Sequence, residues 1–216
     1  MTIVAIDHVA EGRFQQLGLS ADLLVRALLR ADAEAKLTTG LEPPTAEGTT
    51  RYGKTVRYVR EELIPLGWKS DNYRNFCRTI HPSGSFSIAT SSGDEFTGVD
   101  VPGMKPSTKY PKGDLTALAV KQNANQGVLD LGDDYAVGAV DLAVLANIWI
   151  LLQRVTDETI YAELSLPTGI ENGVIVDWEE RILLPQISRQ NPPPAVAVEE
   201  PPSGDGDAYN VEVALR

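Results

Sequence analysis

The longest apolar stretch of the chain is AVGAVDLAVLANIWILLQRV, residues 136–155. Its length equals that of a membrane-spanning helix. However, Asp141, Asn147 and Gln153 interrupt it every six residues, and Arg154 follows directly. Polar groups at this density are costly in lipid, whereas a protein interior can pair them. The pattern therefore predicts a buried helix over 136–155 at the centre of a core, and no membrane span.

Three further segments are predicted to be helices, and two of them have amphipathic spacing. Residues 19–37 carry an apolar stripe behind a Ser20 N-cap, and residues 49–63 repeat apolar side chains at spacings of 4, 3 and 4. That second stripe predicts burial of Tyr52, Val56, Val59 and Leu63. A third helix is predicted over 114–127, where Gly127 would end it.

Two β-hairpins are predicted. The first joins residues 72–80 to residues 85–92, and the register that gathers most apolar side chains on one face sets Ile80 opposite Phe86. The second spans residues 158–185 around Asn172-Gly173, the strongest two-residue turn signal of the chain. That turn would set Leu164 opposite Arg181, so a bulge near residues 167–169 or another loop length must restore the apolar pairing.

These elements predict an α+β fold, in which two antiparallel hairpins pack on about four helices around the 136–155 helix. We expect residues 1–190 to form one globular domain. Residues 191–216 are rich in proline, glycine and acidic side chains, and they predict an extended, largely disordered tail. The overall character of the sequence suits a bacterial, phage or mobile-element protein.

Cysteine and histidine are scarce. Cys77 is the only cysteine, and His8 and His81 are the only histidines. This composition excludes a disulfide framework and zinc sites built from several cysteines or histidines. The sequence predicts no cofactor and no bound metal. A reducing, cytoplasmic location is expected, and residues 1–16 lack the pattern of a signal peptide.

Charge is distributed unevenly along the chain, whose net charge is −11. Residues 51–112 hold ten Lys/Arg against six Asp/Glu, whereas residues 113–216 hold five against seventeen. Most of the chain would therefore repel nucleic acid, while one segment attracts anions. The basic helix at 51–60 with the hairpin after it could form a nucleic-acid surface. We favour instead that its arginines pair with the acidic C-terminal half.

The stretch SSGDEFTGVDVPGMKPSTKYPKG, residues 91–113, combines glycines, hydroxyls and lysines. Backbone donors and positive charge are what a phosphate site needs, and a helix beginning near Asp114 could add its N-terminus. The stretch is no nucleotide-binding P-loop, because Met104 stands where the lysine belongs. The predicted ligand-binding residues are Lys105, Ser107, Thr108, Lys109 and Lys112, with Arg57, Arg74 and Arg78 from the preceding segment. The alternative is a plain crossover loop stiffened by prolines.

The leading hypothesis is a non-enzymatic binding protein for a small phosphorylated or anionic ligand, nucleotide-like in its chemistry. One alternative is a metal-dependent phosphoesterase or nuclease using Asp94, Glu95 and Asp100, whose spacing from the lysines fits such sites poorly. Another is a protein–protein adaptor acting through residues 191–216. Nucleic acid and membrane are not expected partners.

Overall fold

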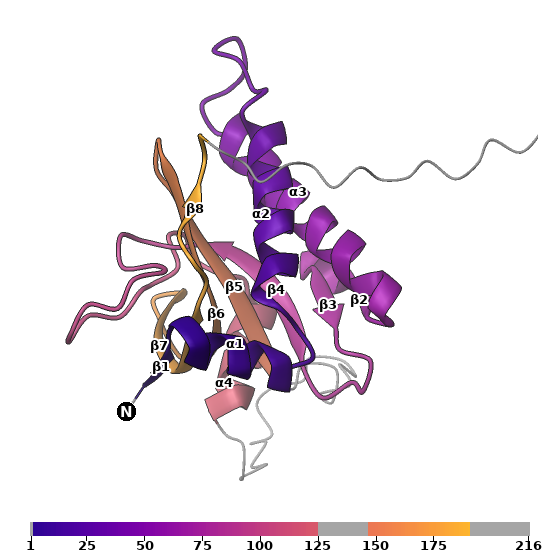
Figure 1. The fold of residues 1–216 in the computed structure, drawn as a ribbon, viewed down its shortest axis with the longest axis vertical. Coiled ribbons are helices and arrows are strands. Elements are labelled where there is room, and N and C mark those ends of the chain that lie inside the picture. The colour runs from indigo at the N-terminus through magenta and orange to yellow at the C-terminus, as the bar shows by residue number, and fades with distance from the viewer. Residues whose placement is uncertain (1, 125–146, 191–216) are drawn as a thin grey trace, which may run out of the picture.

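A sheet of eight strands is the central element of the computed structural model, which describes residues 2–124 and 147–190 (Figure 1). The strand order is β1-β7-β6-β5-β4-β3-β2, and β8 pairs with β6. The strands are β1 (Ile3–Ala5), β2 (Lys69–Asp71), β3 (Arg78–Ile80), β4 (Ser87–Ser92), β5 (Ile148–Val155), β6 (Thr159–Glu171), β7 (Val174–Leu183) and β8 (Ile187–Ser188). The helices are α1 (Asp7–Gln16), α2 (Ala21–Ala35), α3 (Ala46–Leu63) and α4 (Asp114–Ala124), with 3-10 turns η1 (Ile64–Leu66) and η2 (Tyr73–Asn75).

The sheet is mixed. β4 pairs parallel to β5 and β1 pairs parallel to β7, whereas the other pairings are antiparallel. The parallel pairing brings the carboxyl ends of β4 and β5 to the same edge. Side chains and loops that follow these two ends therefore lie close together.

Helices cover both faces of the sheet. Figure 1 shows α1, α2 and α3 on one side and α4 on the other. Along β5, Trp149 and Leu151 join the core under the first three helices, while Ile150 and Leu152 join the core under α4. The mixed helix and sheet content confirms the predicted α+β class. No helix among the described residues is long and apolar enough to cross a membrane.

The predicted helix over 136–155 is wrong for its second half, which forms strand β5. Residues 136–146 lie outside the described residues. β5 is a central strand with neighbours on both sides and cores on both faces, so successive side chains are all buried from Ile148 to Gln153. A strand buried on both faces reads as a continuous apolar run, which cannot be told from a buried helix by periodicity.

The other helices lie close to their predicted positions. α2 falls within 19–37 and begins after Ser20, although the Ser20 side chain makes no capping hydrogen bond. α3 begins three residues before the predicted 49, and the predicted Gly127 end of α4 lies outside the described residues. Val59 and Leu63 are buried as predicted, but Tyr52 is 42% exposed and Thr55 and Tyr58 are buried instead. The buried face is rotated because α3 packs on α2 and on the sheet together.

The first hairpin has a register one residue away from the predicted one. Ile80 lies opposite Ser87, not Phe86, and the His81 amide donates to the Phe86 carbonyl at 3.0 Å to close a four-residue loop. Phe76 and Phe86 consequently contribute to different cores. The apolar pattern could not determine the register here, because both faces of this sheet are buried. Neither register would leave the apolar side chains in water.

The second hairpin turns at Asn172-Gly173, where both residues have positive φ, 50° and 82°. Glu171 pairs with Val174, as a two-residue turn requires. The register shifts between Leu166 and Ile170, and Leu164 then lies opposite Ile182. The irregularity falls where the apolar pairing demanded a bulge.

The buried side chain of Asn123 on α4 satisfies backbone groups that the bulge and the start of β5 leave unpaired. Its amide donates to the carbonyls of Ile148 at 2.9 Å and Pro167 at 3.0 Å, and its oxygen accepts from the Ile148 amide at 3.1 Å. Asn123→Leu is expected to lower the free energy of unfolding by about 2–3 kcal/mol, because these groups would lose their partners. Equilibrium urea unfolding measures this. The exposed Gln186→Leu is the control, and equal stability of both variants would contradict the account.

Candidate functional site

Residues 93–113 are fastened to the sheet at several points, although residues 101–105 are exposed. Thr108 forms an isolated bridge with Gly93, its amide donates to the Ile175 carbonyl at 3.1 Å, and its hydroxyl accepts from the Ile175 amide at 3.0 Å. The Trp178 indole donates to the Pro106 carbonyl at 2.7 Å. Thr108 and Trp178 are both buried. Thr108, a predicted ligand contact, therefore holds the loop on the sheet.

A buried ion pair fixes the first half of this loop. Glu163 and Arg181 are 0% and 2% exposed, and their side chains approach to 2.5 Å. Glu163 also accepts from the Gly98 amide at 2.9 Å, and Arg181 donates to the Val99 carbonyl at 3.0 Å. Gly98 has φ +70°, and a Cβ there would lie 2.6 Å from the Ala162 nitrogen. Only glycine fits this close approach of two backbones.

A cavity of about 590 Å³ opens between this loop, α3 and the sheet edge. The loop contributes Lys109, Tyr110 and Lys112, and the first part of α3 with its preceding residues forms the opposite wall. The floor consists of residues 90–93 and 153–155, at the carboxyl ends of β4 and β5. Its volume is in the range of natural small-molecule sites.

The described walls of this cavity carry four cationic side chains and one carboxylate, Glu47. Arg51 pairs with both Glu47 and the buried Asp32. Lys109, Lys112 and Arg154 form no ion pair with any described residue. The cavity is consequently a positive site in an acidic chain.

Two residues that line the cavity each have a buried side-chain atom without a hydrogen bond: Arg154 at Nε and Thr90 at its hydroxyl. The Arg154 guanidinium lies 4.0 Å from the centre of the Tyr161 ring, a cation–π contact. Burial lowers the pKa of the Lys112 ammonium, since the charged form loses hydration. An anion in the cavity would reverse that effect by stabilising the charged form.

The other predicted ligand-binding residues lie elsewhere. Lys105 pairs with Asp177 at 2.5 Å, and the Ser107 amide donates to Asp94 at 2.8 Å within the loop. Arg57 pairs with Glu61 at 2.7 Å, and Arg78 is buried against Asp71. Of the eight predicted residues, the cavity brings together only Lys109 and Lys112.

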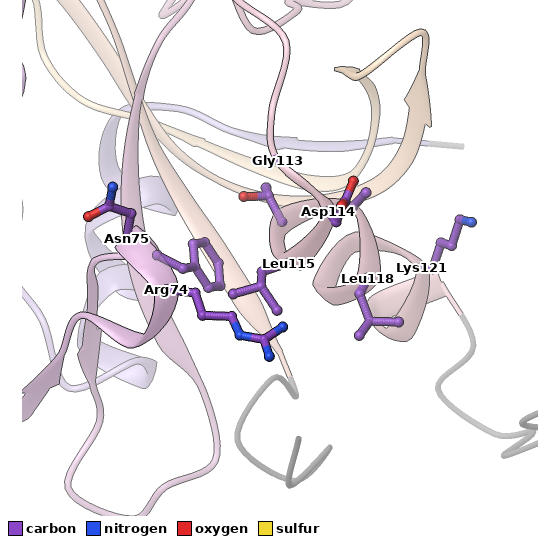
Figure 2. Close-up of a pocket in the computed structure, with 10 residues that line it drawn as sticks. Arg74, Asn75, Gly113, Asp114, Leu115, Leu118 and Lys121 are labelled. Carbon is purple, nitrogen blue, oxygen red and sulfur yellow. The ribbon is translucent and has the colours of Figure 1, made fainter. Parts of the chain in front are cut away.

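Arg74 lines a different cavity, of about 560 Å³, beside the first turns of α4. Figure 2 shows Arg74 and Lys121 on opposite sides of this cavity, with Leu115 and Leu118 between them. Phe76 adds to its apolar surface, and Asp114 supplies a carboxylate at its edge. The predicted α4 N-terminus therefore adjoins Arg74 but not the lysines at 105 and 109.

The basic side chains of α3 are engaged within the protein. Arg51 pairs with Asp32, Lys54 with Glu34 and Arg57 with Glu61, while Arg60 donates to oxygens of residues 71, 72 and 78. The expectation that they pair with the acidic C-terminal half is wrong for these contacts, because α2, which packs along α3, and α3 itself supply the carboxylates. They are thus committed to internal pairs rather than presented as a stripe for nucleic-acid phosphates.

The carboxylates of the metal-dependent alternative are not gathered. Asp94 accepts from the amides of Phe96 at 3.1 Å and Ser107 at 2.8 Å, so it braces the loop. Asp100 lines a third cavity, near α1. Among residues 2–124 and 147–190, no three side chains of the usual metal-ligand types cluster.

The sequence interpretation missed Arg154 and Tyr110. Arg154 fell in the predicted core helix, where it seemed only to end an apolar run. Had residues 148–155 been interpreted as a strand parallel to β4, Arg154 would have been placed at the sheet edge beside the basic loop.

Comparison with protein-family models, with curated proteins and with solved structures gives no match for this chain.

Proposed function

We propose that this protein is a non-enzymatic binding protein that holds a small phosphorylated or otherwise anionic ligand in the cavity between residues 109–112, α3 and the ends of β4 and β5. The observation that carries the proposal is the group of three cationic side chains, Lys109, Lys112 and Arg154, that no described carboxylate neutralises. Lys112 and Arg154 are partly buried, and a partly buried cation loses hydration free energy unless an anion compensates it.

The chemistry of the walls suits phosphate. Two ammonium groups supply point charges, and a guanidinium has a planar fork that can bond two phosphate oxygens at once. The N-terminus of α3 adjoins the cavity and has no side-chain cap, although the Ala46 amide already donates to the Pro43 carbonyl at 2.8 Å. Glu47, the carboxylate of the described lining, is already paired with Arg51 and adds little repulsion.

Binding is favoured over catalysis because Glu47, the carboxylate of the described lining, is committed to the Arg51 ion pair. It is therefore poorly placed to act as a general base toward a ligand. A cytoplasmic location is part of the proposal, since the single half-buried Cys77 suits a reducing compartment.

Calorimetric titration with inorganic pyrophosphate at low ionic strength tests the proposal. Micromolar to millimolar binding is expected, and Lys109→Ala/Lys112→Ala is expected to weaken it about 30-fold or more, because two charge-assisted contacts are lost. Lys105→Ala/Arg57→Ala removes the same charge from residues paired elsewhere, and it should change the affinity less than about threefold.

Unfolding midpoints of both double variants should stay near that of the unchanged protein, since all four side chains are partly exposed. Equal losses of affinity in the two variants would show that pyrophosphate responds only to overall charge. Absence of binding to the unchanged protein would refute the proposed function.

A further inference from the structure

Two tyrosine rings lie in the walls of the same cavity as the three unpaired cations. Tyr110 is 58% exposed and Tyr52 is 42% exposed. Large aromatic side chains with this much accessible surface beside a concave site offer an apolar face that the fold itself does not use. The site therefore combines positive charge with planar aromatic surface.

The backbone on either side of Tyr110 is fixed to the sheet. The Lys109 amide donates to the Ser92 carbonyl at 2.9 Å, and the Lys112 amide donates to the Gly173 carbonyl at 2.7 Å. The Lys109 ammonium lies 5.6 Å from the centre of the Tyr110 ring. The Tyr110 side chain therefore extends from a fixed backbone, so contact with a flat ligand group would not require the loop to become ordered.

Tyr52 is held from the opposite wall. It belongs to α3, and burial is the largest of the effects that raise the pKa of its hydroxyl, with the nearby Cys77 thiol adding to the shift. Tyr52 is thus partly buried against the protein, and it also lines the cavity. A ligand with a flat ring could contact aromatic surface on both walls.

We propose that the ligand is a free nucleotide, with its base against Tyr110 and its phosphates at Lys112 and Arg154. This inference rests on the proposed function, because the phosphate half uses the same cations. Base stacking on an aromatic side chain contributes about five- to a hundredfold in affinity and tolerates any base. A lipid phosphate or a sugar phosphate has no planar group for these rings.

A free nucleotide is favoured over a nucleic-acid strand by the charges around the cavity. The basic side chains of α3 are engaged in ion pairs or hydrogen bonds, so they do not continue the positive surface along a strand. The net charge of −11 opposes a polyanion much more than a single nucleotide. The cavity volume of about 590 Å³ also suits a molecule of nucleotide size.

The test compares each of the four ribonucleoside diphosphates with pyrophosphate by calorimetry, on the unchanged protein and on Tyr110→Ala. The tightest diphosphate is expected to bind at least tenfold better than pyrophosphate. Tyr110→Ala should lower the affinity for that diphosphate to the affinity for pyrophosphate. It should leave the affinity for pyrophosphate unchanged. Tyr73→Ala, which removes a ring of 41% exposure outside this cavity, should change neither.

The outcomes separate the two proposals. If pyrophosphate binds and the protein has the same affinity for each of the four diphosphates as for pyrophosphate, the nucleotide inference fails while the proposed function stands. If neither pyrophosphate nor any diphosphate binds, the proposed function fails and the nucleotide inference fails with it. A ten-nucleotide oligothymidylate that binds more tightly than every diphosphate would overturn the free-nucleotide assignment in favour of a strand.

Discussion

Replacing Glu163 by alanine is expected to lower the free energy of unfolding by about 3–5 kcal/mol, because Arg181 would remain as an unpaired buried charge. Both side chains are almost fully buried, and Glu163 makes two contacts with the Arg181 guanidinium, at 2.5 and 3.0 Å. It also accepts from the Ser165 hydroxyl at 2.8 Å and from the Gly98 amide. Equilibrium urea unfolding, followed by circular dichroism, measures the loss.

Glu179→Ala is the matched control, since Glu179 is an exposed glutamate of β7, the strand that carries Arg181. It should change stability by less than about 0.5 kcal/mol. Hydrogen exchange should also show faster exchange of the Gly98 amide in Glu163→Ala at temperatures where the protein is still folded. If both glutamate variants were equally stable, the account of how residues 93–113 are held would be wrong.

Replacing Asp32 by alanine is expected to cost about 3 kcal/mol of stability, the second-largest effect. Asp32 is 2% exposed, and it accepts from Arg189 at 2.9 Å and from Arg51 at 3.0 Å. It joins α2 to α3 and to the segment after β8. Without it, two largely buried arginines would lose their common partner. The exposed Asp22→Ala, on the first turn of α2, is the control.

The pH dependence of this effect has a definite sign. Burial raises the pKa of Asp32, but hydrogen bonds and charges from Arg189 and Arg51 together outweigh it, and the net pKa is lowered from 3.8. The unfolded chain therefore binds this proton more readily than the folded protein does. The stabilisation is present above pH 3.8 and is lost as the pH falls through the lower folded-state pKa. The difference between Asp32→Ala and the unchanged protein should shrink in acid; a constant difference would contradict the pairing.

The local pattern of apolar and turn residues predicted the elements that have one buried face or a defined turn. α2 shows a clear stripe, and the Asn172-Gly173 turn imposes positive φ at both residues. β5 could not be predicted in this way, because its two buried faces erase the alternation. The register of β3 with β4 failed for the same reason.

Charge along the sequence identified the loop with Lys109 and Lys112 but not the full site. Which cations are free depends on tertiary neighbours: Lys105 meets Asp177, Arg78 meets Asp71 and Arg57 meets Glu61. The first two pairs join residues that come together only when loop and strands fold. Arg154 enters the site because β4 and β5 are parallel, a fact of topology that no local pattern shows.

The most direct test of the account is a two-dimensional ¹⁵N NMR spectrum of the full chain, titrated with inorganic pyrophosphate. The largest shift changes are expected at amides around the proposed cavity, including Gly93, Lys109, Lys112 and Arg154, with saturation at one site. Amides beside Arg74 and the first turn of α4 should be unaffected. A spectrum that does not change, or changes that centre on Arg74 and α4, would contradict the central claim.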